Sequence, residues 1–160
     1  MKTEFNIPLV AIGSNTNLED LNGYALSHGY PENCVKFSRP IKIPDQKLAF
    51  TKYSRGRKGG VLDLKHAIGN VTTAALFYTN ALGLEMLRKK EGVPQHYVEK
   101  EITVIDDGGS EVRAITYVVK PEMRKHFVMP SEEYLNVCKS GYEQVGIFTD
   151  QLFAAAQNQE

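Results

Sequence analysis

Residues 9–15, Leu-Val-Ala-Ile-Gly-Ser-Asn, join a short apolar run to a polar turn. Four apolar residues that end at a glycine are typical of a buried strand, which would deliver the turn to its own end. Glycine permits close approach of the backbone, and successive N–H groups ahead of a helix can bind an anion such as a carboxylate. Gly-Ser-Asn is also common turn chemistry, so the segment alone indicates either a ligand site or an ordinary turn.

After this turn the sequence predicts a short helix and then a β-rich middle. Asn17 or Thr16 can cap the helix, and Gly29 and Pro31 end it. We expect strands where β-forming residues dominate, in the four stretches 35–43, 48–53, 61–64 and 71–78.

The second half of the chain predicts three helices and one β-hairpin. A short helix follows Asn80, with cations in its last turn, and ends at Glu91-Gly92. Strands 97–105 and 112–119 flank a turn at 106–109 and should pair antiparallel. Ser131 can cap the next helix, and 148–156 predicts a last helix that docks loosely.

These elements predict an α+β fold in a single domain, residues 1–160. We expect six or so strands in a small mixed or antiparallel, barrel-like sheet, with helices flanking it. Most strands follow one another through hairpins rather than through crossover helices, which favours a curved or closed sheet.

Composition limits the class of protein. The chain has 19 basic and 19 acidic side chains, and this neutral balance argues against a nucleic-acid binder, which usually displays a basic excess. No segment has the ~20 apolar residues of a membrane span, and the apolar run 8–12 is too short for a signal peptide. We therefore expect a soluble, cytoplasmic protein that acts on a small molecule or binds another protein.

The sequence gives no support for a metal site. Cys34 and Cys138 lie far apart, without a second cysteine or histidine at zinc-ligand spacing, and the 4 histidines are scattered. We expect two reduced thiols and no histidine-centred catalytic triad.

Glu91 is a second candidate for chemistry, because Gly92 and Pro94 fix the direction in which the chain leaves the helix end. A solvated acid that balances Lys89 and Lys90 would have the same sequence.

The basic, glycine-rich segment 54–60 could bind an anion, but it lacks phosphate-loop spacing and is interpreted as a mobile loop that flanks the strands. Tyr97 and Tyr117 lie on the predicted hairpin strands. Each could place its hydroxyl at the mouth of a pocket or lie in the core with one hydrogen bond.

Taken in order, these segments resemble the γ-glutamylcyclotransferase-like (AIG2-like) family over nearly the whole chain. In that family a strand ends in Tyr-Gly-Ser-Asn, Glu-Gly-Val follows a short helix, tyrosines begin one hairpin strand and end its partner, and Pro-Ser-x-x-Tyr opens a late helix. The matching residues here are Ile12-Gly13-Ser14-Asn15, Glu91-Gly92-Val93, Tyr97, Tyr117 and Pro130-Ser131-Glu132-Glu133-Tyr134. Residues 48–54 and 59–61 also resemble the family's middle strands. Each element is common alone, but all of them in this order and spacing would rarely occur together by chance.

The resemblance implies a small barrel with flanking helices that converts a γ-glutamyl amine or amino acid to 5-oxoproline and releases the amine. It implies Glu91 as the catalytic acid/base and no cofactor or metal. The implied substrate-binding residues are Ile12, Gly13, Ser14, Asn15, Tyr97 and Tyr117. A small γ-glutamyl compound is the expected partner, a homodimer is allowed, and neither nucleic acid nor membrane is expected to bind.

One departure from the family pattern is Ile12, which stands where the family has tyrosine and so lacks a hydroxyl and an aromatic face. It motivates an alternative, a catalytically inactive domain of the same fold that binds a ligand or a protein. A third hypothesis, an anion or RNA binder centred on Arg55, Arg57 and Lys58, is the weakest because the chain is neutral.

Overall fold

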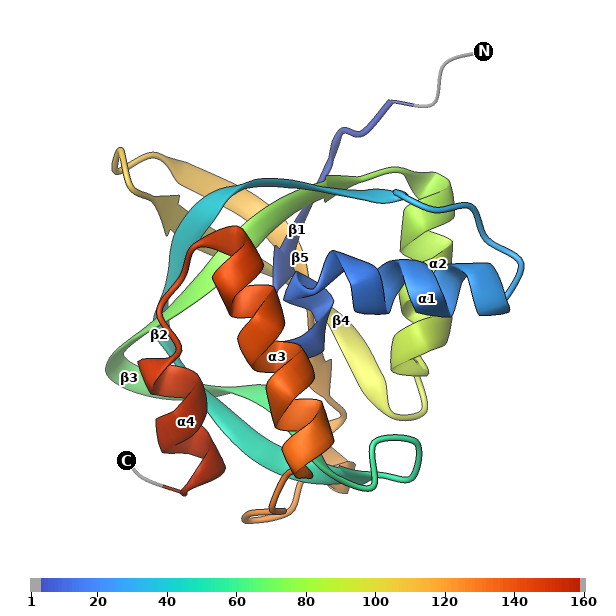
Figure 1. Cartoon of the computed structure of the whole chain (residues 1–160). Helices are drawn as coiled ribbons and strands as arrows, with labels where there is room; N and C mark the ends of the chain where they lie inside the picture. The colour runs from blue at the N-terminus through green and yellow to red at the C-terminus, as the bar shows by residue number, and fades with distance from the viewer. Residues whose placement is uncertain (1–3, 159–160) are drawn as a thin grey trace.

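Five strands close into a barrel in the computed structural model, which describes residues 4–158 (Figure 1). The barrel runs in the order β1-β3-β2-β4-β5, and a short parallel contact between Leu9 and Ile115 closes it. The other neighbouring pairs are antiparallel. The strands are β1 (Ile7–Ala11), β2 (Val35–Ser54), β3 (Gly59–Thr79), β4 (Tyr97–Asp106) and β5 (Glu111–Val119). The α+β, barrel-like prediction is therefore confirmed.

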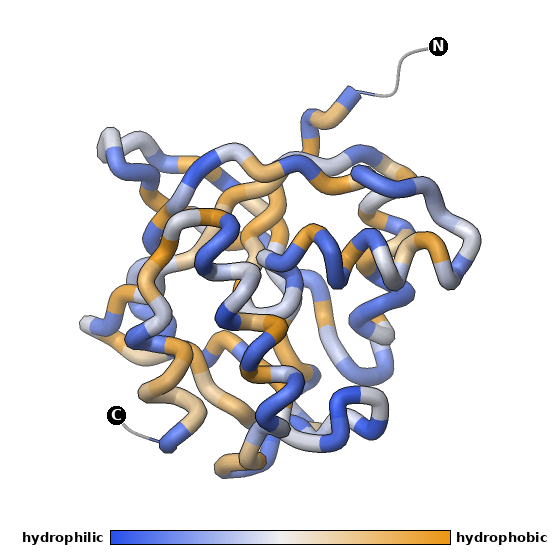
Figure 2. Tube along the Cα trace, in the orientation of Figure 1, coloured by the Kyte–Doolittle hydropathy of each residue, from blue (hydrophilic) through white to orange (hydrophobic). Residues whose placement is uncertain are grey.

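Helices pack on the outside of the barrel (Figure 1). They are α1 (Leu18–Ser27), α2 (Ala81–Glu91), α3 (Glu132–Val145) and α4 (Asp150–Ala156), with short 3-10 turns η1 (Gly13–Thr16) and η2 (Pro121–Met123). The predicted caps are present, since the side chains of Asn17 and Ser131 accept hydrogen bonds from the N–H groups of Asp20 and Tyr134. Apolar residues recur along the strands (Figure 2). Polar residues are frequent on the helices and loops around them.

The four strands predicted in the middle of the chain are two long ones. β2 has 20 residues and β3 has 21, and they pair from Val35–Thr79 to Ser54–Gly59. The prediction broke β2 near Pro44 and Asp45, but a bulge absorbs this segment and the strand continues. Bulges also bend long strands, which allows so few strands to close a barrel.

The C-terminal helix docks more firmly than predicted. Leu152 of α4 is fully buried and Ala155 is buried. The Gln151 side chain accepts from the Thr73 N–H at 2.9 Å and donates to the Val71 carbonyl at 2.8 Å, both on β3. The expectation of loose docking was wrong, because one apolar face and one amide were enough to fasten the helix to the barrel.

A buried carboxylate, Asp63 on β3, joins several parts of the barrel. It is inaccessible to solvent and accepts from the Thr51 hydroxyl of β2 at 3.0 Å and the Val119 N–H of β5 at 2.9 Å. Its own neighbour Leu64 donates at 2.8 Å, and the Arg124 guanidinium donates at 2.6 Å. The carboxylate is thus fully hydrogen-bonded and paired with a cation, as a buried charge requires.

The segment after η2 lies along the barrel and leads to α3. Lys125 N–H donates to the Thr51 carbonyl at 2.7 Å, and Val128 N–H donates to the Phe50 carbonyl at 2.9 Å. Opposite it, a Cβ on Gly60 would lie 1.8 Å from the Val128 carbonyl oxygen, so only glycine permits this approach. The segment fixes where α3 begins, and α3 forms one wall of the cleft described below.

We predict that Asp63→Ala lowers the free energy of unfolding by about 3–5 kcal/mol, because it leaves Arg124 and two N–H groups without their acceptor. Denaturant unfolding followed by circular dichroism measures the change. The matched control is Glu101→Ala, which breaks an ion pair with Arg113 whose two side chains are 57% and 71% exposed and should cost less than about 1 kcal/mol. Equal effects of the two substitutions would show that Asp63 is not a structural hub.

Candidate active site

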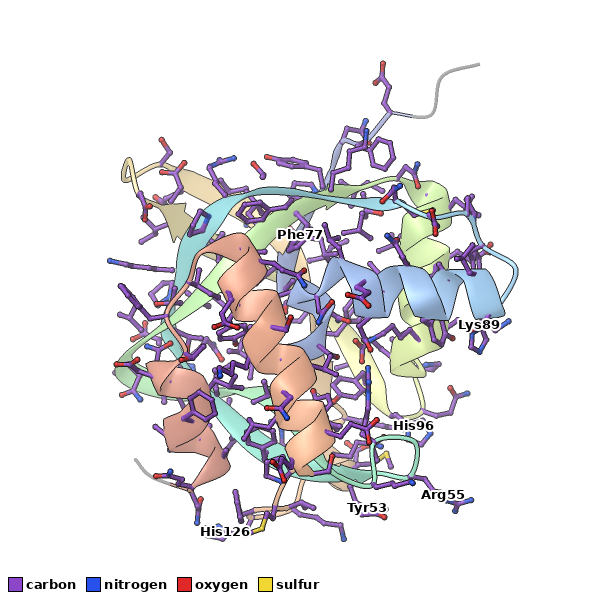
Figure 3. The ribbon with its side chains drawn as sticks, viewed as in Figure 1. Tyr53, Arg55, Phe77, Lys89, His96 and His126 are labelled. Carbon is purple, nitrogen blue, oxygen red and sulfur yellow. The ribbon has the colours of Figure 1, made fainter. Side chains whose placement is uncertain are left out.

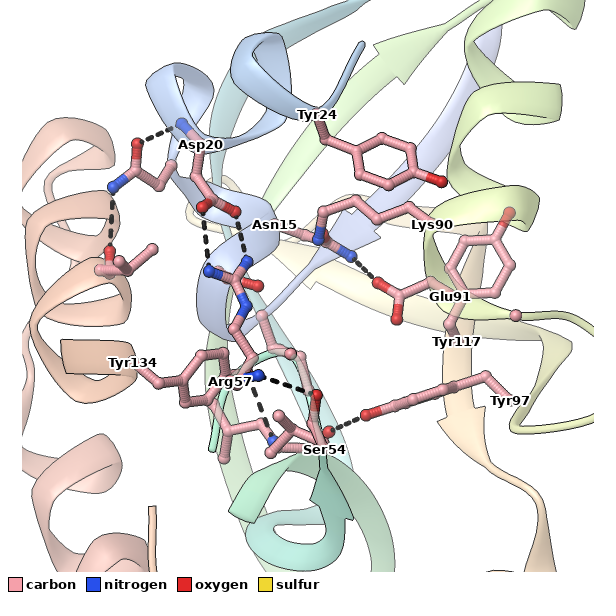
Figure 4. Close-up of a pocket in the computed structure, with 18 of the residues that line it drawn as sticks. Asn15, Asp20, Tyr24, Ser54, Arg57, Lys90, Glu91, Tyr97, Tyr117 and Tyr134 are labelled. Atoms are coloured by element: carbon pink, nitrogen blue, oxygen red, sulfur yellow. Dashed lines mark hydrogen bonds and ion pairs between the residues drawn. The ribbon is translucent and has the colours of Figure 1, made fainter. Parts of the chain in front are cut away.

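A cleft of about 1550 Å³ opens beside the end of β1, between α1, α3, the end of α2 and the loop after β2 (Figure 4). Six of the seven residues predicted from the sequence line it: Ile12, Ser14, Asn15, Glu91, Tyr97 and Tyr117. The seventh, Gly13, lies buried beneath the lining. Residues far apart in the chain therefore meet at one place.

Glu91 is the last residue of α2, and its backbone is held by the end of that helix. Gly92 is left-handed, with φ of 67°, and donates to the Lys89 carbonyl, while Val93 donates to the Arg88 carbonyl. These bonds satisfy the last carbonyls of the helix and make glycine the favoured residue after Glu91. The side chain of Glu91 is partly buried and extends into the cleft.

The Asn15 side chain connects Glu91 to Lys90 (Figure 4). Its Nδ2 donates to Glu91 Oε1 at 2.6 Å, and its Oδ1 accepts from Lys90 Nζ at 2.8 Å. Only the amide oxygen can accept from a lysine and only the amide NH₂ can donate to a carboxylate, so this orientation is chemically determined. Asn15 therefore orients Glu91, and both ends of its amide are already occupied.

The loop before Asn15 has fewer backbone N–H groups free to bind an anion than the sequence suggested. Gly13 has φ of 58°, and a Cβ there would lie 2.8 Å from the Leu62 side chain. Its N–H donates to the Tyr142 hydroxyl at 3.4 Å, and the Asn15 N–H donates to the Ile12 carbonyl at 3.3 Å. Within residues 4–158, no group accepts the Ser14 N–H. Ser14 also lines the cleft, so its N–H is the backbone donor of this loop that lacks an acceptor among the described residues.

Tyr97 and Tyr117 have their hydroxyl protons committed to protein acceptors. Tyr97 donates to the Leu62 carbonyl at 3.0 Å, and Tyr117 donates to Glu99 Oε1 at 2.9 Å. Burial raises the pKa of both phenols well above the usual value of 10, with added effects of the Glu91 charge on Tyr97 and of the Glu99 hydrogen bond on Tyr117. Both hydroxyls therefore stay protonated at neutral pH and present lone pairs, as Glu91 does, to a donor in the cleft.

Sequence reasoning missed the opposite side of the cleft. Arg57 forms a two-pronged ion pair with Asp20 of α1, at 3.1 and 2.7 Å, and its guanidinium lies over the Tyr134 ring, 5.3 Å from the centroid. The basic loop that was interpreted as flanking structure therefore lines the cleft (Figure 4). No local pattern pairs Arg57 with Asp20, since they are 37 residues apart. The Pro-Ser-x-x-Tyr motif did contain Tyr134, but without a role.

Tyr24 of α1 is another lining residue that the sequence did not indicate. Burial, and then the negative charge of Glu91, raise the pKa of its phenol. Its ring also stacks on His28, with centroids 3.9 Å apart. Tyr24 and Glu91 are far apart in the sequence, so no local pattern relates the two residues.

The described residues contain no group of three or more His, Cys, Asp or Glu side chains arranged to hold a metal ion. Cys34 and Cys138 are free and buried, and burial raises the pKa of the Cys138 thiol to about 12, so this thiol is a poor nucleophile. Between residues 4 and 158, no helix has the length and apolar character needed to cross a membrane.

Comparisons with known proteins agree with this fold. The model of the AIG2-like family matches residues 73–151. An uncharacterised protein from Homo sapiens has a TM-score of 0.79 at 22% identity, covering 98% of this chain and 89% of its own. A γ-glutamyl cyclotransferase has a TM-score of 0.79 at 21% identity, covering 96% and 88%.

YkqA from Bacillus subtilis has a TM-score of 0.80 at 20% identity, and the match covers 96% of this chain but 55% of YkqA. No curated protein sequence matches. At these identities the solved structures show a shared fold, while the family model adds a match in sequence. The AIG2-like family model thus matches the second half of the chain, and the fold that the chain shares with a γ-glutamyl cyclotransferase extends over nearly its whole length.

Proposed function

We propose that this chain converts a γ-glutamyl amine or amino acid to 5-oxoproline and the free amine, with Glu91 as general acid and base. The observation that carries the proposal is the Glu91 carboxylate, which projects into the cleft and is held there by the 2.6 Å hydrogen bond from Asn15. A hydrogen-bonded donor on one oxygen fixes the rotamer and leaves the second oxygen available to a substrate.

The reaction needs positioning and proton transfer more than strong binding. The substrate's α-amine attacks its own γ-carbonyl carbon, which forms the lactam C–N bond, and the original amide C–N bond then breaks. Glu91 takes a proton from the α-ammonium group before the attack and gives one to the departing nitrogen. In all, the attacking nitrogen loses two protons to become the lactam N–H, and the departing nitrogen gains two to leave as an ammonium ion, so one carboxylate that takes and returns a proton twice balances the reaction. Folding the glutamyl chain within the cleft makes the attack intramolecular, which removes much of the entropic barrier.

The cleft lining offers hydrogen-bond acceptors for the substrate's α-ammonium group and a donor for its γ-carbonyl oxygen. An ammonium group is a donor only, and it would meet acceptors on Glu91, Tyr97 and Tyr117, whose own protons point elsewhere. The Ser14 N–H is a donor that can stabilise negative charge on the attacked carbonyl oxygen. This arrangement separates a cation-binding side from an oxyanion-binding side.

The alternative is a non-catalytic domain that binds a ligand in the same cleft. Ile12 favours it, because this side chain lines the cleft where the family has a tyrosine hydroxyl. An anion or RNA binder centred on the basic loop is less well supported, because Asp20 already neutralises Arg57. Turnover separates the first two hypotheses.

We predict that Glu91→Gln lowers the rate of 5-oxoproline release from a panel of γ-glutamyl amides by about 10²–10⁴-fold. The substitution keeps the shape of the side chain and its acceptor for Asn15 but removes the ability to carry a proton. Release is measured by chromatography of the purified proteins. Glu85→Gln, on the exposed face of α2, is the matched control and should leave the rate unchanged. Turnover in the Glu91→Gln variant at the wild-type rate contradicts the assignment of Glu91.

We predict that Asn15→Ala lowers kcat by about 10- to 100-fold, because Glu91 loses the hydrogen bond that orients it. Lys90→Met should lower kcat by a smaller factor. If Lys90 acts through Asn15, the double variant will be no slower than Asn15→Ala alone. Steady-state kinetics on the four proteins completes this cycle, and multiplicative losses would show that Lys90 acts independently of Asn15.

A further inference from the structure

Lys52 on β2 is a partly buried cation that lines the cleft. A bulge interrupts the pairing of β2 between Phe50 and Lys52, and the intervening Thr51 donates to the buried Asp63. Lys52 Nζ donates to the Tyr53 carbonyl at 3.3 Å, which is a long hydrogen bond to its own neighbour. It forms no ion pair with any carboxylate of residues 4–158. Its positive charge therefore has no fixed counter-charge.

The other cations near the cleft are placed differently. Arg57 is paired with Asp20, and Lys90 donates to Asn15. Arg55 is exposed on the loop after β2 and points away from the body of the protein (Figure 3). Among the described lining residues, Lys52 and Lys90 are the partly buried cations without an ion pair, and Lys52 is the one of the two whose ammonium group makes no hydrogen bond to another side chain.

The electrostatic environment of Lys52 also favours the binding of an anion. Burial lowers the pKa of its ammonium group below the usual value of 10.5, and the negative charge of Glu91 acts in the opposite sense. An ammonium group that loses water without gaining a counter-ion is unfavourable, so the bound state gains free energy if an anion arrives. Lys52 and the proposed catalytic carboxylate, Glu91, both line this cleft.

We propose that Lys52 binds a carboxylate of the γ-glutamyl substrate and so determines which compounds enter the cleft. This inference rests on the proposed function. Two carboxylates have the required chemistry: the α-carboxylate of the glutamyl group, and the carboxylate of the departing amine when that amine is an amino acid. Ammonium–carboxylate pairing in a partly desolvated cleft is stronger than at an exposed surface.

Calorimetric titration in the Glu91→Gln background tests the inference without any need for turnover. The two ligands are γ-glutamylalanine and γ-glutamylethylamide, which differ only in the carboxylate of the departing amine. The proteins are Glu91→Gln alone and with Lys52→Met, Lys52→Arg or Lys42→Met added. Lys42 is the matched control, because it is an exposed lysine on the same strand and lies outside the cleft lining.

Lys52→Met is expected to weaken γ-glutamylalanine binding by about 10- to 100-fold, and Lys52→Arg is expected to retain most of the affinity. Weakening confined to γ-glutamylalanine assigns Lys52 to the departing carboxylate, whereas equal weakening of both ligands assigns it to the α-carboxylate. Either result supports the inference. It is overturned if Lys52→Met changes both affinities by no more than Lys42→Met does, or if neither ligand binds. Turnover by the wild-type protein is measured separately, so binding without turnover would reject the proposed function and leave the carboxylate site intact.

Discussion

The buried pairing of Asp63 with Arg124 is the constraint on which the other features depend. One carboxylate without solvent contact receives donors from β2, β5 and the segment that leads to α3. The preceding residue, Leu62, then presents its carbonyl to the Tyr97 hydroxyl and its N–H to the Tyr134 hydroxyl. The strand that holds the barrel together therefore also positions two tyrosines of the cleft. Rigid placement of this kind is what a site that works by positioning requires.

Several side chains of the cleft already use their hydrogen-bond donors within the protein. Tyr97, Tyr117 and Asn15 each use their donors within the protein, so their positions are fixed and the tyrosine oxygens face the cleft as acceptors. Near them, Ser14 offers a backbone donor and Lys52 a cation. A zwitterionic γ-glutamyl group carries both an ammonium and a carboxylate, and it would find complementary partners in this one cavity. Under the proposed function, the placement of these donors and acceptors would determine which compounds bind.

The sequence predicted those features that local chemistry determines. Glycine at position 13, the caps at Asn17 and Ser131, and the hairpin turn at 106–109 each depend on residues close in the chain, and all are present. The resemblance placed Asn15 and Glu91 in one site, and their side chains are in contact although they are 76 residues apart. What could not be predicted depends on tertiary contact: the Asp63–Arg124 and Asp20–Arg57 pairs, the continuity of β2 through its bulges, and the firm docking of α4. Polar partners that far apart leave no periodic signal.

The central claim is that Glu91 exchanges protons with the α-amine of a γ-glutamyl compound. A crystal structure of the Glu91→Gln variant with γ-glutamylalanine bound tests it most directly. The account predicts the α-amine within about 3 Å of the side chain at position 91, and the γ-carbonyl oxygen close to the Ser14 N–H. A ligand bound with its α-amine directed to solvent, or bound outside this cleft, would contradict the account.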